Sequence, residues 1–322
     1  MDMKRRLEEI NHLKIFSGNA NPALAKKICE HLSIQLGNAY VGRFPDGEID
    51  LKVNEDVRGA DVFLVQPTCS PVNENLTELL IFIDCLKRAS AARITAVLPY
   101  YGYARKDRKD EGRVPITAKL VANIITEAGA DRVLTVDLHA AQIQGFFDIP
   151  VDHLLAFPVI SKYFERLALS DLVVVTPDVG GIKLARNYSK KLGIKMAIVD
   201  KRRVGPEETE IGFVIGDVAN KNVVMIDDLI ATGGSIAQAA NVLKERGAKD
   251  IYVGATHPVF CGSAVEKLSA APIKEIIVTD TIPLSEKAKG LKDKIKVLSI
   301  SGLLGDAIMR IHRHESVSSL FV

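Results

Sequence analysis

An acid pair followed by a glycine loop is the segment of the sequence best suited to chemistry. Asp227 and Asp228 end an apolar run, and Thr232-Gly-Gly-Ser235 follows just before a helical pattern begins. Glycines let backbone N–H groups turn onto an anion, the hydroxyls add donors, and a helix N-terminus adds partial positive charge. The segment is typical of a phosphate-binding loop, and the acids indicate hydroxyl groups or a metal ion on the same ligand.

A tight turn before a capped helix would give the same glycine pattern, with Ser235 as the N-cap. The sequence contains no GxxxxGKS/T pattern, and no GxGxxG follows its first strand. It therefore predicts neither a P-loop nucleotide site nor a Rossmann dinucleotide site.

Two further apolar runs end near groups that ligate metals, His139 and Asp178. Ligands of open α/β sheets lie at the carboxyl ends of strands, so these side chains could meet at one Mg²⁺, directly or through water, since that ion takes few protein ligands. Taken singly, Asp178 is equally compatible with a helix N-cap, and His139 with a hydrogen-bonded core residue. We expect His257 to be structural and His312, in the charged tail, to be solvated.

Basic groups cluster in two segments. Lys201-Arg-Arg203 follows a strand and precedes a Gly/Pro/Glu stretch that predicts a mobile loop, an arrangement suited to phosphoryl transfer or to a solvated rim. Residues 100–110 combine tyrosines with mixed charge, which would suit stacking on a base or binding to RNA. Residues 43–48 predict a hairpin tip centred on Asp46-Gly47.

The elements that position these groups alternate between buried strands and helical patterns, which predicts an α/β protein with parallel sheets. Residues 122–139 and 240–257 share Ala-Asn, Glu, Gly-Ala and a final His at matching positions, which favours an internal duplication. Two prolines in the segment 147–158 mark the boundary. We expect domains at residues 1–155 and 156–322.

Composition excludes several classes of protein. In 322 residues, 42 basic and 40 acidic side chains give a net charge of +2, which argues against a dedicated nucleic-acid binder. The four cysteines are widely separated, so a reduced chain is favoured over a disulfide framework. The charged N-terminus and the lack of a long apolar run favour a cytoplasmic protein without membrane contact.

With these segments in place, the chain resembles the class I-like ribose-phosphate pyrophosphokinases along nearly its whole length. The resemblance is carried by the following motifs: KIFSGNANPALA (14–25), RFPDGE (43–48), PYYGYARKDRK (99–109), PITAKLVANII (115–125), DLHAAQIQGFFDIPVDHL (137–154), TPDVGG (176–181), IVDKRR (198–203), IDDLIATGGS (226–235) and SVSSLF (316–321).

The resemblance implies two similar phosphoribosyltransferase-like domains that transfer the diphosphoryl group of Mg-ATP to the C1 hydroxyl of ribose 5-phosphate, with release of AMP. It implies a homo-oligomer, typically a hexamer built from dimers, in which the 43–48 tip serves a neighbouring subunit. The roles that it implies are these: catalysis by Lys201 and Arg203; ATP binding by Phe44, Asp46, Gly47, Glu48, Arg105 and Lys106; ribose 5-phosphate binding by Arg203, Asp227, Asp228, Thr232, Gly233, Gly234 and Ser235; Mg²⁺ binding by His139 and Asp178, with Asp137, Asp148 and Asp152 as weaker candidates.

The main departure from the family pattern is Ala231, where an aspartate is usual. Its carboxylate would lie beside the reacting sugar, so its loss would lower turnover or affinity without abolishing the chemistry. The substitution leaves open a second hypothesis, a regulatory or inactive paralogue that assembles with active subunits. A third, a phosphoribosyltransferase, is opposed by the complete N-terminal half.

Overall fold

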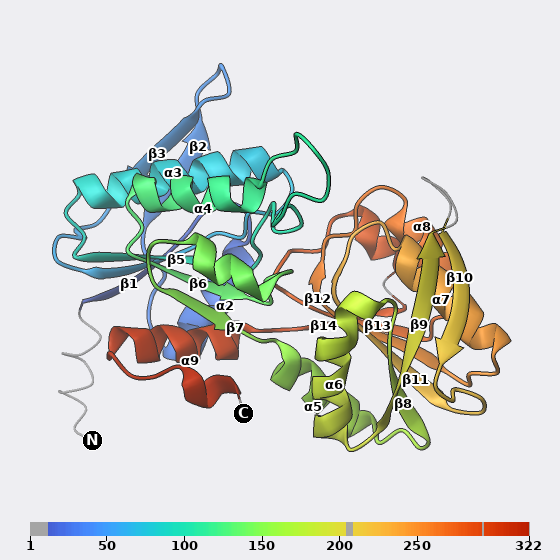
Figure 1. Cartoon of the computed structure of the whole chain (residues 1–322). Helices are drawn as coiled ribbons and strands as arrows, with labels where there is room; N and C mark the ends of the chain where they lie inside the picture. The colour runs from blue at the N-terminus through green and yellow to red at the C-terminus, as the bar shows by residue number, and fades with distance from the viewer. Residues whose placement is uncertain (1–11, 204–208, 292, 322) are drawn as a thin grey trace. The chain divides into compact units, whose positions relative to one another are not determined.

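The chain forms two compact α/β units in a computed structural model that describes residues 12–203, 209–291 and 293–321 (Figure 1). The side chains of residues 200–212 and 321 lie outside this description. Unit 1 takes the described residues of Met1–Leu155 and Ile300–Val322, and unit 2 takes those of Ala156–Ser299. Among the described residues, no helix has the length and apolar character needed to cross a membrane.

Unit 1 is built on a parallel sheet of five strands in the order β1-β4-β5-β6-β7. Its strands are apolar on both faces because helices cover them, as expected for a parallel sheet. A separate antiparallel hairpin, β2–β3, extends from this unit (Figure 1). The elements of unit 1 are β1 (Leu13–Ser17), α2 (Pro22–Leu32), β2 (Ala39–Arg43), β3 (Ile49–Val53), β4 (Asp61–Val65), α3 (Val72–Arg88), β5 (Arg93–Leu98), α4 (Thr117–Ala128), β6 (Arg132–Val136), η1 (Ala141–Phe146), β7 (Val151–Leu154), α9 (Ser301–His312) and η4 (Ser318–Phe321).

Unit 2 has a seven-stranded sheet in the order β10-β9-β8-β11-β12-β13-β14, parallel except for the edge pair β10–β9. β11 and β12 lie in its interior, and every residue of β12 is buried. The elements of unit 2 are α5 (Phe157–Leu167), β8 (Leu172–Thr176), η2 (Val179–Gly181), α6 (Ile182–Leu192), β9 (Lys195–Arg203), β10 (Thr209–Ile215), β11 (Asn222–Ile230), α7 (Gly234–Glu245), β12 (Ile251–Pro258), α8 (Ala264–Ala270), β13 (Glu275–Thr279), η3 (Lys287–Leu291) and β14 (Ile295–Leu298).

The two units repeat one pattern, in agreement with the duplication expected from the sequence. The order β4-β5-β6-β7 in unit 1 has the same sequence of parallel neighbours as β8-β11-β12-β13 in unit 2. The matching sequence segments form α4 with β6 and α7 with β12. The predicted fold class, two similar α/β domains with mainly parallel sheets, is confirmed.

The tail of the chain differs from the expected division, because residues 300–322 group with unit 1 rather than with a domain 156–322. α9 packs against α2 and buries an apolar face that includes Leu304 and Ile308. Gly305 permits the approach, since a Cβ there would lie 2.6 Å from Cδ2 of His31. The periodicity of α9 predicts a helix but does not tell which core it covers.

His312 is not solvated, contrary to the expectation. Its Nδ1 lies 2.7 Å from Oδ2 of Asp61 at the start of β4. Arg93 donates to the same carboxylate from Nε at 2.7 Å and also donates to the backbone oxygen of Ile311 at 3.1 Å. These contacts fasten the C-terminal helix to the sheet of unit 1.

Candidate active site

The acid pair and the glycine loop lie at the carboxyl end of a central strand, as predicted. Asp227 and Asp228 are half-buried residues of β11, which pairs in parallel with β8 and β12. The loop 231–233 then leads into α7, whose first residue is Gly234. Backbone N–H groups at this helix start have no intrahelical acceptor, so they are available to an anion.

The N-cap of α7 is Gly233, so the alternative in which Ser235 caps the helix is wrong. Gly233 has φ 70° and ψ −4°, a left-handed conformation that glycine adopts without steric cost. A Cβ at this position would also lie 3.1 Å from Cγ of Leu268. Thr232 and Ser235 are both exposed, so their hydroxyls face solvent at the mouth of the loop.

Two backbone hydrogen bonds hold the loop against the segment after β12. The N–H of Phe260 donates to the oxygen of Ile230, and the N–H of Cys261 donates to the oxygen of Ala231, both at 2.9 Å. Ala231 therefore contributes its backbone to the loop's anchor, while its half-buried methyl group leaves the position without a polar side chain.

Lys267 is a candidate functional residue that the sequence reasoning missed. It belongs to α8, and its Nζ would lie 3.7 Å from a Cβ on Gly234. The side chain is exposed, and among the described residues it makes no ion pair. A cation at a helix N-terminus is unfavourable unless an anion lies between them, so this placement suits a phosphate. The sequence shows only that Lys267 lies in α8, the helix after β12, and β12 is the strand beside β11.

The carboxyl end of β11 carries concentrated negative charge. Burial, the adjacent Asp228 and then Asp178 together raise the pKa of Asp227 well above its ordinary value. Asp178 follows β8, the strand beside β11, so the structure brings these three predicted site residues together. A ligand hydroxyl or a cation at this point would relieve the repulsion and favour the charged form of Asp227.

Asp178 itself caps the short helix η2, which is the N-cap role that the sequence left open for it. Its Oδ1 accepts from the N–H of Gly181 at 3.1 Å. Its Oδ2 has no donor among the described residues, so the cap leaves one oxygen for a ligand.

The predicted catalytic residues Lys201 and Arg203 lie in the last part of β9, where their backbones pair with β10. Their side chains, and residues 204–208, where the sequence predicts a mobile loop, are outside the described part of the chain.

In unit 1, His139 is exposed rather than buried in the core, and it follows a strained residue. Asp137 has φ 39°, a left-handed conformation that is uncommon outside glycine and is often found at functional sites. The N–H of Leu138 donates to Nε2 of His153 at 2.9 Å, which fixes the segment from β7. The structure thus presents His139 at the end of β6 on a constrained backbone.

The three weaker metal candidates have other partners. Asp152 pairs with Arg132 at 2.6 Å, and the exposed Asp148 lies 3.4 Å from Nζ of Lys119. Asp137 is buried. Among the described residues, no three His, Cys, Asp or Glu side chains are grouped as a metal site.

The ATP candidates 44–48 form the exposed tip of the β2–β3 hairpin, as predicted. The N–H of Phe44 donates to the oxygen of Glu48 at 2.8 Å, and Glu48 donates its own N–H to Oδ1 of Asp46 at 3.1 Å. Gly47 has φ 96°, which the turn requires. The ring of Phe44 is 49% exposed, which leaves it available to stack.

The other ATP candidates, Arg105 and Lys106, lie in the segment between β5 and α4. Both side chains are exposed, and Lys106 lies 3.4 Å from Asp110. The backbone oxygen of Lys106 accepts from the N–H of Ala118 in the first turn of α4. By the order of strands, this segment occupies the place in unit 1 that the phosphate loop occupies in unit 2.

His257, the counterpart of His139 in the repeat, is structural. It is buried, and its Nδ1 lies 3.0 Å from Oγ1 of Thr281. The four cysteines are free.

A parallel sheet that ends in an acid pair, a glycine loop and a helix start defines an α/β protein of the phosphoribosyltransferase-like class. Family models extend this result to both halves of the chain. The N-terminal domain of ribose phosphate pyrophosphokinase matches residues 13–129, and the phosphoribosyl synthetase-associated domain matches residues 204–322.

Individual relatives cover nearly the whole chain. The ribose-phosphate pyrophosphokinase of Rhodopirellula baltica is 58% identical over 315 residues, which are 97% of this chain and 99% of the relative. That of Caldanaerobacter subterraneus is 56% identical over 312 residues, or 97% and 98% of the two chains. The crystal structure of phosphoribosylpyrophosphate synthetase from Mycobacterium smegmatis is 42% identical, with a TM-score of 0.88 over 94% of this chain and 100% of the other. The chain belongs to the ribose-phosphate pyrophosphokinase family.

Proposed function

We propose that the protein transfers the β,γ-diphosphoryl group of ATP to ribose 5-phosphate, giving 5-phosphoribosyl 1-diphosphate and AMP. The observation that carries this proposal is the placement of Asp227 and Asp228 directly before the loop 232–235 on a central strand, in a chain of this family. That arrangement suits a ligand with adjacent hydroxyls and a phosphate, which is the chemistry of a sugar phosphate.

The sugar is held by unit 2. The start of α7, the hydroxyls of Thr232 and Ser235, and the ammonium of Lys267 bind the 5-phosphate. Asp227 and Asp228 accept hydrogen bonds from ribose hydroxyls and so orient C1 toward the nucleotide.

In the transfer step, the C1 hydroxyl oxygen forms a bond to the β-phosphorus of ATP. The bond from that phosphorus to the oxygen bridging the α-phosphate breaks, AMP leaves with this oxygen, and the hydroxyl proton is released. Lys201 and Arg203 stabilise the charge that develops on the transferring group, while Phe44, Asp46, Gly47, Glu48, Arg105 and Lys106 bind the nucleotide.

Mg²⁺ fits the donors of the site. His139 in unit 1 and Asp178 in unit 2 would each serve a Mg²⁺ site, directly or through water, since Asp178 keeps a carboxylate oxygen without a donor among the described residues and His139 is exposed. The bound ion would neutralise phosphate oxygens of ATP.

The proposed assembly is a homo-oligomer, with a hexamer built from dimers as the expected form. The exposed hairpin tip supports it, because a projecting loop of this kind can complete the nucleotide site of another copy. Light scattering during size-exclusion chromatography tests the assembly, and a monomer with full activity would exclude it.

The activity is tested by mixing the full-length protein with ATP, Mg²⁺ and ribose 5-phosphate, and following AMP and the product together. Equal amounts of both are expected, with none in EDTA. A folded oligomer that forms no AMP at saturating substrate would overturn the proposal and favour the inactive-paralogue hypothesis raised by Ala231. Consumption of added phosphoribosyl diphosphate with a free base would favour a phosphoribosyltransferase instead.

A further inference from the structure

The β2–β3 hairpin depends on other parts of unit 1 for its position. It is a two-stranded sheet of its own, and such hairpins are marginally stable in isolation. Val41, Leu51 and Val53 pack on the core of unit 1, but Tyr40 and Phe44 on the hairpin are about half exposed. Apolar packing therefore holds the base of the hairpin and leaves the orientation of its tip to polar contacts.

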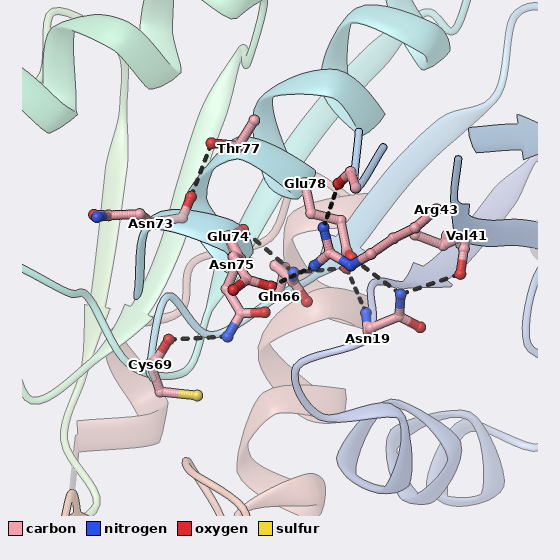
Figure 2. A network of polar contacts seen from close by, with 11 residues as sticks. Asn19, Val41, Arg43, Gln66, Cys69, Asn73, Glu74, Asn75, Thr77 and Glu78 are labelled. Carbon is pink, nitrogen blue, oxygen red and sulfur yellow. Dashed lines mark hydrogen bonds and ion pairs between the residues drawn. The ribbon is translucent and has the colours of Figure 1, made fainter. Parts of the chain in front are cut away.

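A buried carboxylate, that of Glu78 in α3, lies at the base of the hairpin (Figure 2). Its Oε1 accepts from the N–H of Asn19 at 2.6 Å and from Nε2 of Gln66 at 2.9 Å. Its Oε2 accepts from Nδ2 of Asn19 at 3.0 Å. Nδ2 of Asn19 also donates to the backbone oxygen of Val41 at 3.1 Å, which connects Glu78 to β2 through one side chain.

The network is closely packed around Gly18. A Cβ on Gly18 would lie 2.4 Å from Oε1 of Gln66 and 2.7 Å from Oε1 of Glu78. A buried carboxylate is costly unless donors surround it, and here amide donors take that role. A glutamine in place of Glu78 would keep one acceptor oxygen and turn an N–H₂ group toward a donor that has lost its acceptor.

The first turn of α3 makes the second connection to the hairpin. Arg43 donates from Nη2 to Oε2 of Glu74 at 2.5 Å and from Nη1 to the backbone oxygen of Gly47 at 3.1 Å (Figure 2). Gly47 is a residue of the tip itself. One guanidinium therefore joins the tip turn to α3.

The same turn also contacts the segment that carries Arg105. The hydroxyl of Tyr103 hydrogen-bonds to Oδ1 of Asn73, and Nδ2 of Asn75 donates to the oxygen of Cys69 at 2.9 Å. Thr68, the residue before Cys69, accepts at Oγ1 from the N–H of Gly102 at 2.7 Å. Residues 73–78 of α3 thus hold both segments that carry the ATP candidates.

We propose that Glu78 and the Arg43–Glu74 pair are positioning residues for the nucleotide, which fix the β2–β3 tip relative to the start of α3. They touch no substrate and act through Phe44, Asp46 and Glu48. The inference rests on the proposed function for its link to ATP, whereas the anchoring of the hairpin is independent of it.

Steady-state kinetics of Glu78→Gln and Glu74→Gln in the full-length oligomer test the link to ATP. The KM for ATP is expected to rise about 10-fold in Glu78→Gln, the effect of one lost charge-assisted hydrogen bond to a buried carboxylate. A smaller rise, about 2- to 3-fold, is expected in Glu74→Gln, because the Arg43–Glu74 pair is half exposed. The KM for ribose 5-phosphate and kcat are expected to change less than about 2-fold, because the phosphate loop lies in unit 2. Equal increases in both KM values, or an unchanged KM for ATP, would overturn the positioning role.

Asp84→Ala is the matched control, because Asp84 forms an exposed ion pair with Arg88 on the same helix. Its kinetics are expected to equal those of the wild type. The exchanged double variant Arg43→Glu with Glu74→Arg is expected to recover most of the affinity that either single reversal loses. A double variant no better than the singles would show that the pair does not act as a pair.

Hydrogen exchange of residues 39–53, measured without substrate, separates this inference from the proposed function. Faster exchange is expected in Glu78→Gln and Glu74→Gln than in the wild type and in Asp84→Ala. If the wild type lacks the transferase activity but hairpin exchange is faster in Glu78→Gln and Glu74→Gln than in the wild type, only the proposed function fails. If exchange in the hairpin is unchanged, the anchoring itself is refuted, whatever the activity.

Discussion

Asp227 lies in β11 and Asp178 follows the neighbouring parallel strand β8, and Asp178 is one of the groups that perturb the Asp227 carboxyl. Burial acts most strongly, then the charge of Asp228, then that of Asp178, and all three raise the pKa of Asp227. The ligand-free site is thus less stable than it would be with fewer charges, as is common where a protein is preorganised to bind.

Asp227→Asn is therefore expected to stabilise the ligand-free protein while it removes most of the activity. A raised pKa means that the folded state holds its proton longer than the unfolded chain, so the penalty grows as pH rises through that range. We expect the melting temperature to rise by roughly 2–4 °C at about pH 8, and the gain to vanish near pH 4. Thermal unfolding across this range checks it, with Glu266→Gln, an exposed carboxylate of the same unit, as the control. A gain that is constant with pH would contradict the electrostatic cause.

Lys267→Met is expected to raise the KM for ribose 5-phosphate about 10-fold or more, with little change in the KM for ATP. Methionine keeps an unbranched stem and removes the ammonium that lies beside Gly234. Lys249→Met is the matched control, because Lys249 follows the opposite end of α7 and pairs with Asp171. Equal effects of the two substitutions would show that Lys267 acts only through the overall charge of the protein and not through a contact with the 5-phosphate.

Ala231→Asp is expected to raise kcat/KM for ribose 5-phosphate by about 3- to 10-fold, through one added hydrogen bond to the sugar. The anchor of the loop should persist, since it uses the backbone oxygen of Ala231. Ala231→Asn separates hydrogen bonding from charge. Lower efficiency in the aspartate variant would show that this chain's loop is arranged around the alanine.

Asp61→Asn is expected to destabilise the protein by about 2–4 kcal/mol near neutral pH, since it breaks a largely buried ion pair. Burial alone would raise the pKa of Asp61, but hydrogen bonds from His312 and Arg93, and their charges, outweigh it and lower that pKa. The stabilisation is therefore present above the ordinary aspartate range and is lost as pH falls through the lowered pKa.

Denaturant unfolding at several pH values measures this difference. Asp84→Asn, which breaks an exposed pair, is expected to cost less than about 1 kcal/mol. A cost for Asp61→Asn as small as that of the control would mean that the contact does not hold the C-terminal helix.

The sequence predicted those parts of the site whose residue types determine both the local backbone conformation and the chemistry. The glycine loop after Asp228 and the turn at Asp46-Gly47 were found from residue types alone, because each needs backbone conformations or donors that few residues supply. Strand ends were equally readable, since continuous apolar runs mark parallel strands covered by helices.

Contacts between distant segments could not be read in the same way. Lys267 reaches the phosphate loop from α8, and Glu78 reaches Asn19 across a long stretch of chain. The expectation of a solvated His312 was wrong for the same reason, because its partner Asp61 is distant in the sequence. The Ser235 cap was wrong for a local reason, because Gly233 takes a left-handed conformation and the helix starts at Gly234.

The return of α9 to unit 1 makes unit 2 an insertion within the chain of unit 1. On the ribosome, unit 2 has all of its residues once Ser299 has emerged, whereas unit 1 lacks the helix that covers α2 until Ser301–His312 has followed. The usual N-to-C order of domain folding is then reversed at the final step. A nascent chain stopped at residue 299 would contain the whole phosphate loop, but its unit 1 would lack the helix that covers α2.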